Sequence, residues 1–98
     1  MQAALDAISH PGRRRLLELV MDCERQVGEL ADLTGMTQPA ASQHLRVLRE
    51  SGLVDVKVDG PRRLYRVNFE GLAELRSDLE QFWGNHLDVL RHATESKT

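Results

Sequence analysis

The polar residues between positions 37 and 51 recur at the spacing of one helical face. At 100° per residue, a helix over 37–51 places Ala41, Leu45 and Leu48 together on one side. The opposite side carries Pro39, Ser42, Gln43, Arg46 and Arg49, flanked by Gln38 and Glu50. Glutamine can bind adenine and arginine can bind guanine through two hydrogen bonds, each good pair contributing roughly 1 to 3 kcal/mol of base discrimination. The pattern predicts a helix that packs by its leucines and reads base edges in a major groove.

The same polar face could instead merely solvate a surface helix, which is the usual role of such a face. The residues in front of the helix favour the first interpretation. Apolar positions over 30–33 indicate a preceding helix, which Gly35 can end in the left-handed conformation. Thr37 is placed to cap the next helix, and Pro39 is tolerated in its first turn. The segment therefore predicts two helices joined by a tight turn, of which the second faces DNA.

A β-hairpin is predicted directly after this helix. Gly52 ends the helix, and valines at 54, 56 and 58 then alternate with charged residues, which is the period of a half-buried strand. Residues 59–62 supply a turn, and residues 63–67 supply the returning strand.

Arginines at the hairpin tip are candidates for contact with nucleic acid. Arg62 and Arg63 project positive charge that suits phosphate or minor-groove contact. For Lys57 and Arg66 the alternative stays open that basic residues on an edge strand only discourage aggregation. The three consecutive arginines at 13–15 could likewise contact the DNA backbone or simply solvate their helix.

The charge distribution supports one DNA-facing segment despite the formal net charge of −2. Residues 42–67 hold six basic and three acidic side chains, a net of +3, whereas residues 68–98 hold three basic and six acidic ones, a net of −3. Because the position of charge matters more than its sum, the first segment can face phosphate and the second cannot.

Other classes of function find no support in the sequence. Ser42 and His44 are two residues apart on one helix and so diverge, no acid orients either, and no phosphate-binding glycine loop or metalloprotease motif is present. No run of about 18 apolar residues could cross a membrane, and no secretory signal is apparent. The single cysteine, Cys23, can form neither an internal disulfide nor a cysteine-based zinc site. We expect a cytoplasmic protein without enzyme activity, metal, other cofactor or small-molecule substrate.

The remaining elements predict a mainly α fold with one small hairpin, in the order helix, helix, helix, helix, hairpin, helix. Short helices are expected at about 3–9 and 11–21, and a last helix at about 70–92. Apolar residues recur in the last helix at alternating steps of three and four, the seam of a coiled coil. We expect the first and last helices to form a homodimer interface through Leu5, Ile8, Leu72, Leu75, Leu79, Phe82, Trp83, His86 and Leu90.

These residues resemble the arsenical-resistance repressor family, ArsR/SmtB, over roughly residues 4–90. The most specific part is Ser-Gln-His-Leu-Arg-Val-Leu-Arg-Glu-Ser-Gly-Leu-Val at 42–54. The resemblance implies a single winged helix-turn-helix domain over 1–98, with a recognition helix at about 37–51, a wing at about 53–67 and a dimerisation helix at about 70–92. It further implies a dimeric repressor that binds double-stranded operator DNA. His10 stands where the family often has Asp before the proline, which predicts a weaker helix cap.

Metal sensing is where the sequence departs most from the family. Members that sense arsenic or cadmium carry paired cysteines in the third helix, but residues 29–33 here are Glu-Leu-Ala-Asp-Leu. Zinc and nickel sensors use Asp and His along the last helix, where this chain has His86, Asp88 and His92. Asp88 and His92 could share a metal, whereas His86 faces another way. We favour His86 as an interface residue, His92 as a solvated one and His44 as a packed structural histidine.

Two alternatives to a plain repressor stay open at this point. One is a repressor released by metal at His86, Asp88 and His92, or by oxidation at Cys23. The other is a winged-helix module that binds protein rather than DNA. Salt dependence distinguishes the second from a DNA binder, because phosphate contacts weaken steeply as salt rises.

Overall fold

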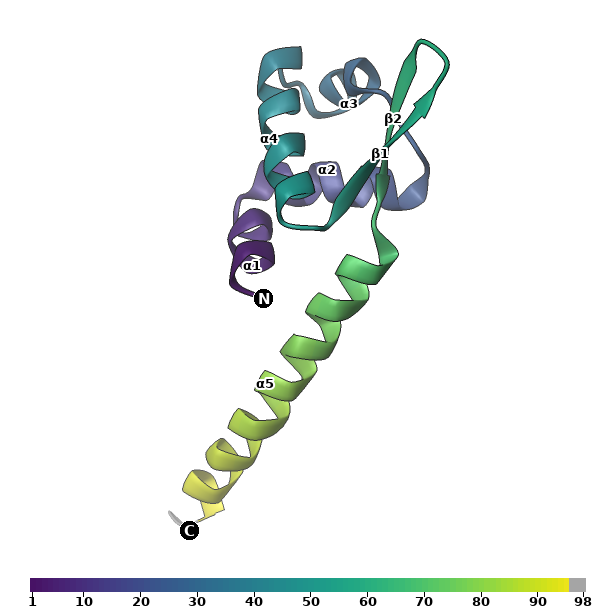
Figure 1. Ribbon diagram of the computed structural model, residues 1–98. Helices are drawn as coiled ribbons and strands as arrows, with labels where there is room; N and C mark the ends of the chain where they lie inside the picture. The colour runs from purple at the N-terminus through teal and green to yellow at the C-terminus, as the bar shows by residue number, and fades with distance from the viewer. Residues whose placement is uncertain (96–98) are drawn as a thin grey trace.

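The computed structural model describes the backbone of residues 1–95 and the side chains of residues 1–86 and 91–93. Its elements follow the expected order (Figure 1): α1 (Gln2–Ser9), α2 (Pro11–Asp22), α3 (Val27–Thr34), α4 (Gln38–Glu50), β1 (Val54–Asp59), β2 (Arg62–Val67) and α5 (Phe69–Glu95). No helix in the described part of the chain is long and apolar enough to span a membrane.

The turn between α3 and α4 has the predicted chemistry. Gly35 ends α3 in the left-handed conformation at φ 74°, where a side chain would be strained. The Thr37 hydroxyl accepts a hydrogen bond from the Ala40 N–H at 3.2 Å, so it caps α4 as expected. Ala31 of α3 and Ala41 of α4 are buried, and the two helices are in contact.

Leucines from several elements fix α4 to the body. Leu45 and Leu48 of α4 are fully buried together with Leu16 of α2, Leu30 of α3 and Leu53 before β1. Removing such a side chain costs about 2 to 5 kcal/mol, because the surrounding atoms cannot fill the cavity. The apolar side of α4 is therefore committed to the core, and its orientation leaves the polar side outward.

The corner between α1 and α2 shows how His10 takes the place of the family's aspartate. The Nδ1 atom of His10 accepts a hydrogen bond from the Gly12 N–H at 3.0 Å, so histidine caps α2 in place of aspartate. Arg13 donates from Nε to the Ala7 carbonyl at 2.7 Å and from Nη2 to the Asp6 carbonyl at 3.2 Å. Arg13 therefore stabilises the end of α1, which leaves Arg14 and Arg15 as the candidates for DNA contact in this cluster.

The strands β1 and β2 pair as an antiparallel hairpin, which we call the wing. Val54 pairs with Val67 at its base and Asp59 with Arg62 at its tip, so Gly60 and Pro61 form a two-residue turn. Gly60 has φ 60°, as such turns require. One further pairing was not predicted: Arg25, between α2 and α3, forms a bridge with Tyr65 of β2. The wing is thereby attached to the helical part of the chain.

The last helix leaves the wing at Asn68 and projects away from the body (Figure 1). The Asn68 side chain accepts a hydrogen bond from the Gly71 N–H at 3.1 Å and so caps the start of α5. At Gly71 the helix backbone lies directly against the carbonyl of Gly52, which ends α4. This close approach sets the direction of α5 relative to α4.

One residue of the predicted dimer seam belongs to the core of the single chain. Leu75 is only 5% exposed and packs with the core leucines, so little of it is left for a partner. Four other predicted seam residues are half-buried against the same core: Leu5, Ile8, Leu72 and Leu79. Phe82 and Trp83 are 41% and 52% exposed, and His86 is exposed. The side chain of Leu90 lies outside the described residues.

Candidate nucleic-acid interface

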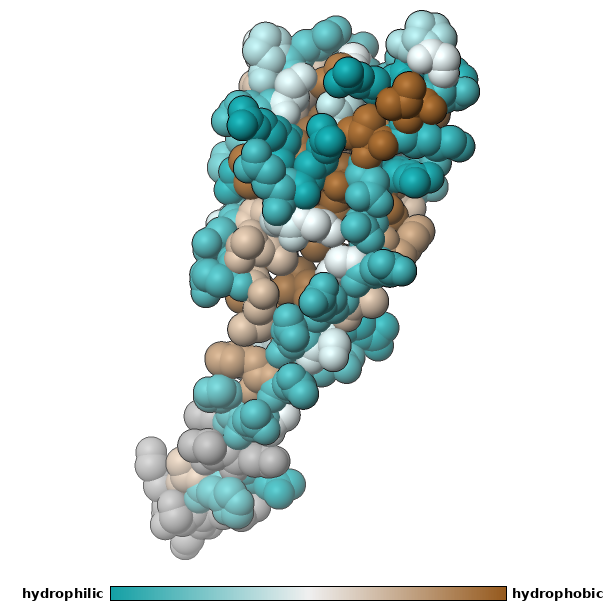
Figure 2. All heavy atoms as spheres, viewed as in Figure 1, coloured by the Kyte–Doolittle hydropathy of each residue, from teal (hydrophilic) through white to brown (hydrophobic). Residues whose placement is uncertain are grey.

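All the residues expected to touch DNA have exposed side chains. Seven of them lie at the start and along the outward side of α4: Thr37, Gln38, Pro39, Ser42, Gln43, Arg46 and Arg49. Arg62 and Arg63 are exposed at the tip of the wing. Figure 2 shows that hydrophilic side chains cover much of the body on the face that it displays. The division of α4 into a buried and an exposed side thus follows the sequence pattern.

The four arginines of this surface differ in their partners. Arg46 forms an ion pair with Glu50 at 2.9 Å, and Arg62 forms one with Asp59 at 2.7 Å. Both pairs are more than half exposed, so each contributes little and can be exchanged for a base or a phosphate. Arg49 and Arg63 have no carboxylate partner in the part of the chain that the structure describes.

Two grooves lie between α4 and the neighbouring elements. One, of about 430 Å³, is lined by Gln38 at the start of α4, by Pro61 and Arg63 of the wing tip, and by the start of α3. The other, of about 560 Å³, is lined by Arg46, Arg49, Arg66 and residues of β1. The structure thus brings Gln38 to Arg63, and Arg46 and Arg49 to Arg66. Arg66 also forms an ion pair with Glu24 at 3.8 Å, so its role stays open between DNA contact and protection of the strand edge.

His44 lies on the inner edge of α4 and is a packed histidine. Its ring stands 4.6 Å from that of His10, measured between centroids, and its Nδ1 atom is buried without a hydrogen-bond partner. Burial lowers the pKa of His44 below its ordinary value, and the nearby His10 and Arg13 add to this effect. The ring therefore favours the neutral form between α4 and the α1–α2 corner.

Stability should consequently decrease in mild acid. Below about pH 6.5, the ordinary histidine pKa, the unfolded chain takes up a proton at His44 more readily than the folded chain does. We expect the urea midpoint to be lower at about pH 5.5 than at about pH 7.5, and the His44→Gln variant to lose part of this difference. His92→Gln, at an exposed position near the end of α5, is the control that should retain it. An equal pH dependence in wild type and His44→Gln would contradict the assignment.

The residues considered for metal or redox sensing do not form a cluster where they are described. No group of three His, Cys, Asp or Glu side chains in the described part could hold an ion together. The Nδ1 atom of His86 is 2.7 Å from the Phe82 carbonyl, and its ring stacks on Phe82 at 4.1 Å. The Asp88 side chain lies outside the described residues. Cys23 is exposed at the end of α2.

Comparison with known proteins relates the chain to bacterial regulators. The family model "Bacterial regulatory protein, arsR family" matches residues 10–56, from the cap of α2 into β1. The HTH-type transcriptional regulator Rv2034 of Mycobacterium tuberculosis is 41% identical over 80 residues, which cover 82% of this chain and 75% of that protein.

Solved structures extend the similarity to most of the chain. The homodimeric winged helix-turn-helix DNA-binding domain of a possible ArsR-family regulator from Mycobacterium bovis matches with a TM-score of 0.70 and 31% identity, over 88% of this chain and 80% of that one. The transcriptional repressor BigR from Xylella fastidiosa matches with a TM-score of 0.67 and 35% identity, over 85% and 82%. This chain therefore belongs to the arsR family of bacterial regulatory proteins, and its fold is a winged helix-turn-helix.

Proposed function

We propose that this protein is a transcriptional repressor that binds a palindromic operator as a homodimer and carries no catalytic activity. It acts on operator DNA in the cytoplasm. In this proposal α4 enters the major groove as the recognition helix, and the wing contacts the backbone or the minor groove beside it.

The observation that carries the proposal is the orientation of α4. Its leucines are fully buried while Ser42, Gln43 and Arg46 are exposed on the opposite side. If the polar side of α4 served only to face water, the helix would need no basic wing beside it. Arg63 of the wing tip and Gln38 of α4 nevertheless line one groove. Base-reading and phosphate-binding groups are thus combined on one surface, as DNA recognition requires.

The dimer is proposed from the apolar face of α5. A groove of about 680 Å³ runs along this helix, lined mainly by apolar residues, among them Ile8, Leu72, Leu79 and Trp83. The helix is 27 residues long and projects from the body, and a helix without tertiary packing is marginal in water. The α5 helix of a second copy of the chain, packed against this groove, would bury these side chains and support the helix. The name of the M. bovis neighbour, a homodimeric domain, agrees with this arrangement.

Selection of bound fragments from random and genomic DNA tests the proposal. We expect a palindromic site with half-sites about one helical turn, or a multiple of it, apart. The log-log slope of affinity against salt should be about −0.9 for each phosphate neutralised. Enrichment of no sequence at moderate ionic strength would refute the proposal, and binding of a protein instead, with little salt dependence, would favour an interaction module.

Arg46 provides the residue-level test. Arg46→Ala should weaken binding to the selected fragment by about 1 to 3 kcal/mol and binding to random DNA by less, because a lost base contact affects only the cognate site. Fluorescence anisotropy with both DNAs measures the difference. An equal loss on both would assign Arg46 to a phosphate instead.

A further inference from the structure

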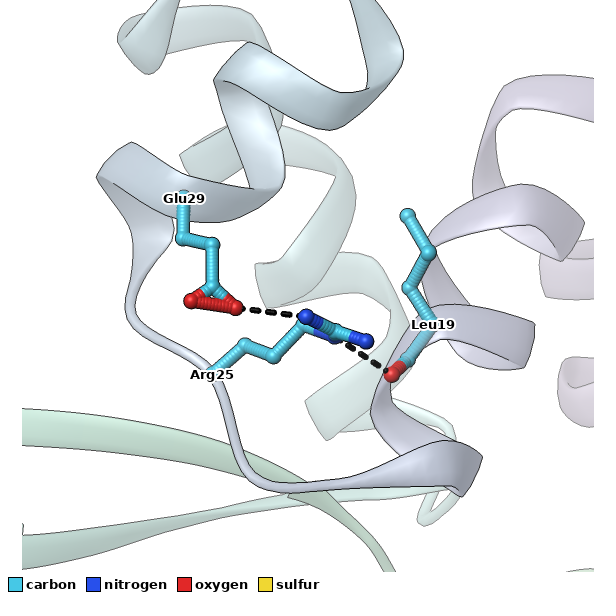
Figure 3. A network of polar contacts seen from close by, with 3 residues as sticks. All are labelled: Leu19, Arg25 and Glu29. Carbon is cyan, nitrogen blue, oxygen red and sulfur yellow. Dashed lines mark hydrogen bonds and ion pairs between the residues drawn. The ribbon is translucent and has the colours of Figure 1, made fainter.

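Arg25 lies between α2 and α3 and bonds to both helices and to β2; Figure 3 shows its side-chain contacts with Leu19 and Glu29. Its Nε atom donates to the Leu19 carbonyl of α2 at 2.9 Å, and its Nη1 atom donates to the Glu29 carboxylate of α3 at 2.6 Å. Its backbone exchanges two hydrogen bonds with Tyr65 of β2, at 3.0 and 2.8 Å. The side chain is only 20% exposed, unlike the arginines of α4 and the wing tip.

The local electrostatics favour a charged arginine at this point. Leu19 lies in the last turn of α2, where carbonyls carry partial negative charge, and Glu29 lies in the first turn of α3. The hydrogen bond to Glu29 raises the pKa of the Arg25 guanidinium, which therefore stays charged. A guanidinium can bond two acceptors in different directions from one planar group, whereas a lysine ammonium provides no such fixed geometry.

We propose that Arg25 is a positioning residue for DNA binding, which holds the wing at a fixed place relative to α4. The Tyr65 pairing lies two positions from Arg63 in β2. Arg63 in turn lines the groove that Gln38 of α4 shares. An isolated two-stranded hairpin is only marginally stable. Because Arg25 pairs with Tyr65 near the middle of β2 and bonds to α2 and α3, it limits the movement of the wing. The inference rests on the proposed DNA-binding function and adds a residue that itself touches no DNA.

The variant Arg25→Lys tests this role without changing the net charge. We expect it to weaken binding to the selected DNA fragment by about three- to tenfold, within the range of coupling between interacting residues. The matched control is Arg13→Lys, at a half-buried arginine of α2 that also donates to backbone carbonyls, those of Ala7 and Asp6 in α1 at 2.7 and 3.2 Å. The control should bind as the wild type does. Hydrogen exchange of the Tyr65 amide should be faster in Arg25→Lys than in the control.

A double-mutant cycle separates positioning from mere stabilisation. Arg63→Ala should weaken binding in the wild-type background and cost clearly less in the Arg25→Lys background, since a displaced wing has already lost the contact. An unchanged cost of Arg63→Ala would overturn the inference, as would wild-type affinity of Arg25→Lys. Either result leaves the proposed function intact provided that a fragment is selected, whereas failure to select any fragment refutes the proposed function itself.

Discussion

Replacing Gly71 with alanine should lower the free energy of unfolding by about 3 kcal/mol, the upper part of the range for overpacked sites. A Cβ atom at this position would lie 1.9 Å from the Gly52 carbonyl oxygen and 2.9 Å from its carbon. Both are backbone atoms at the end of α4, so no side-chain rotation relieves the clash, and α5 must move away. Urea unfolding followed by circular dichroism measures the loss, which is large against a typical domain stability of about 5 to 15 kcal/mol.

The same substitution at Gly84 is the matched control, because this glycine lies in the same helix with no atom within 4 Å of its added Cβ. Alanine is a better helix former than glycine, so Gly84→Ala should stabilise the protein by about 0.5 to 1 kcal/mol. The opposite signs of the two effects distinguish close backbone approach from helix propensity. Equal effects of the two changes would show that α5 does not pack against the end of α4 in solution.

Replacing Trp83 with glutamate should convert the protein to monomers and weaken operator binding by about 10² to 10⁴-fold, since a monomer loses the gain from two linked half-sites. Trp83 lines the apolar groove of α5 and is 52% exposed in the single chain. A carboxylate there would have to be desolvated in the dimer, which is costly without a partner. Sedimentation at micromolar concentration measures the oligomeric state, and anisotropy measures the affinity.

Leu33→Glu is the control for this variant, because Leu33 is 49% exposed on α3 and lies away from the α5 groove. It should remain dimeric. Leu79 is a less suitable position, since it packs against the core of its own chain and its replacement would also change stability. A dimeric Trp83→Glu variant would exclude this face of α5 from the interface.

The helix-turn-helix and the wing were predictable from sequence because their determinants are local. The leucine spacing of α4, the left-handed Gly35 and the Thr37 cap each act over a few residues, and the structure has all three. The exposure of the expected DNA-facing residues of α4 followed from the same periodicity, and that of Arg62 and Arg63 followed from their place at the hairpin turn. That these residues touch DNA is a proposal, which the Arg46 experiment tests.

Only the tertiary structure decided how the elements are joined. Arg25 and Tyr65, like Gly52 and Gly71, meet although they are far apart in the chain, and no spacing rule predicts such pairs. The heptad pattern identified Leu75 as apolar but could not show whether it is buried by its own chain or by a partner, because the same side chain satisfies either environment. Local periodicity determines which face of a helix is apolar, whereas contacts between distant segments determine what covers that face.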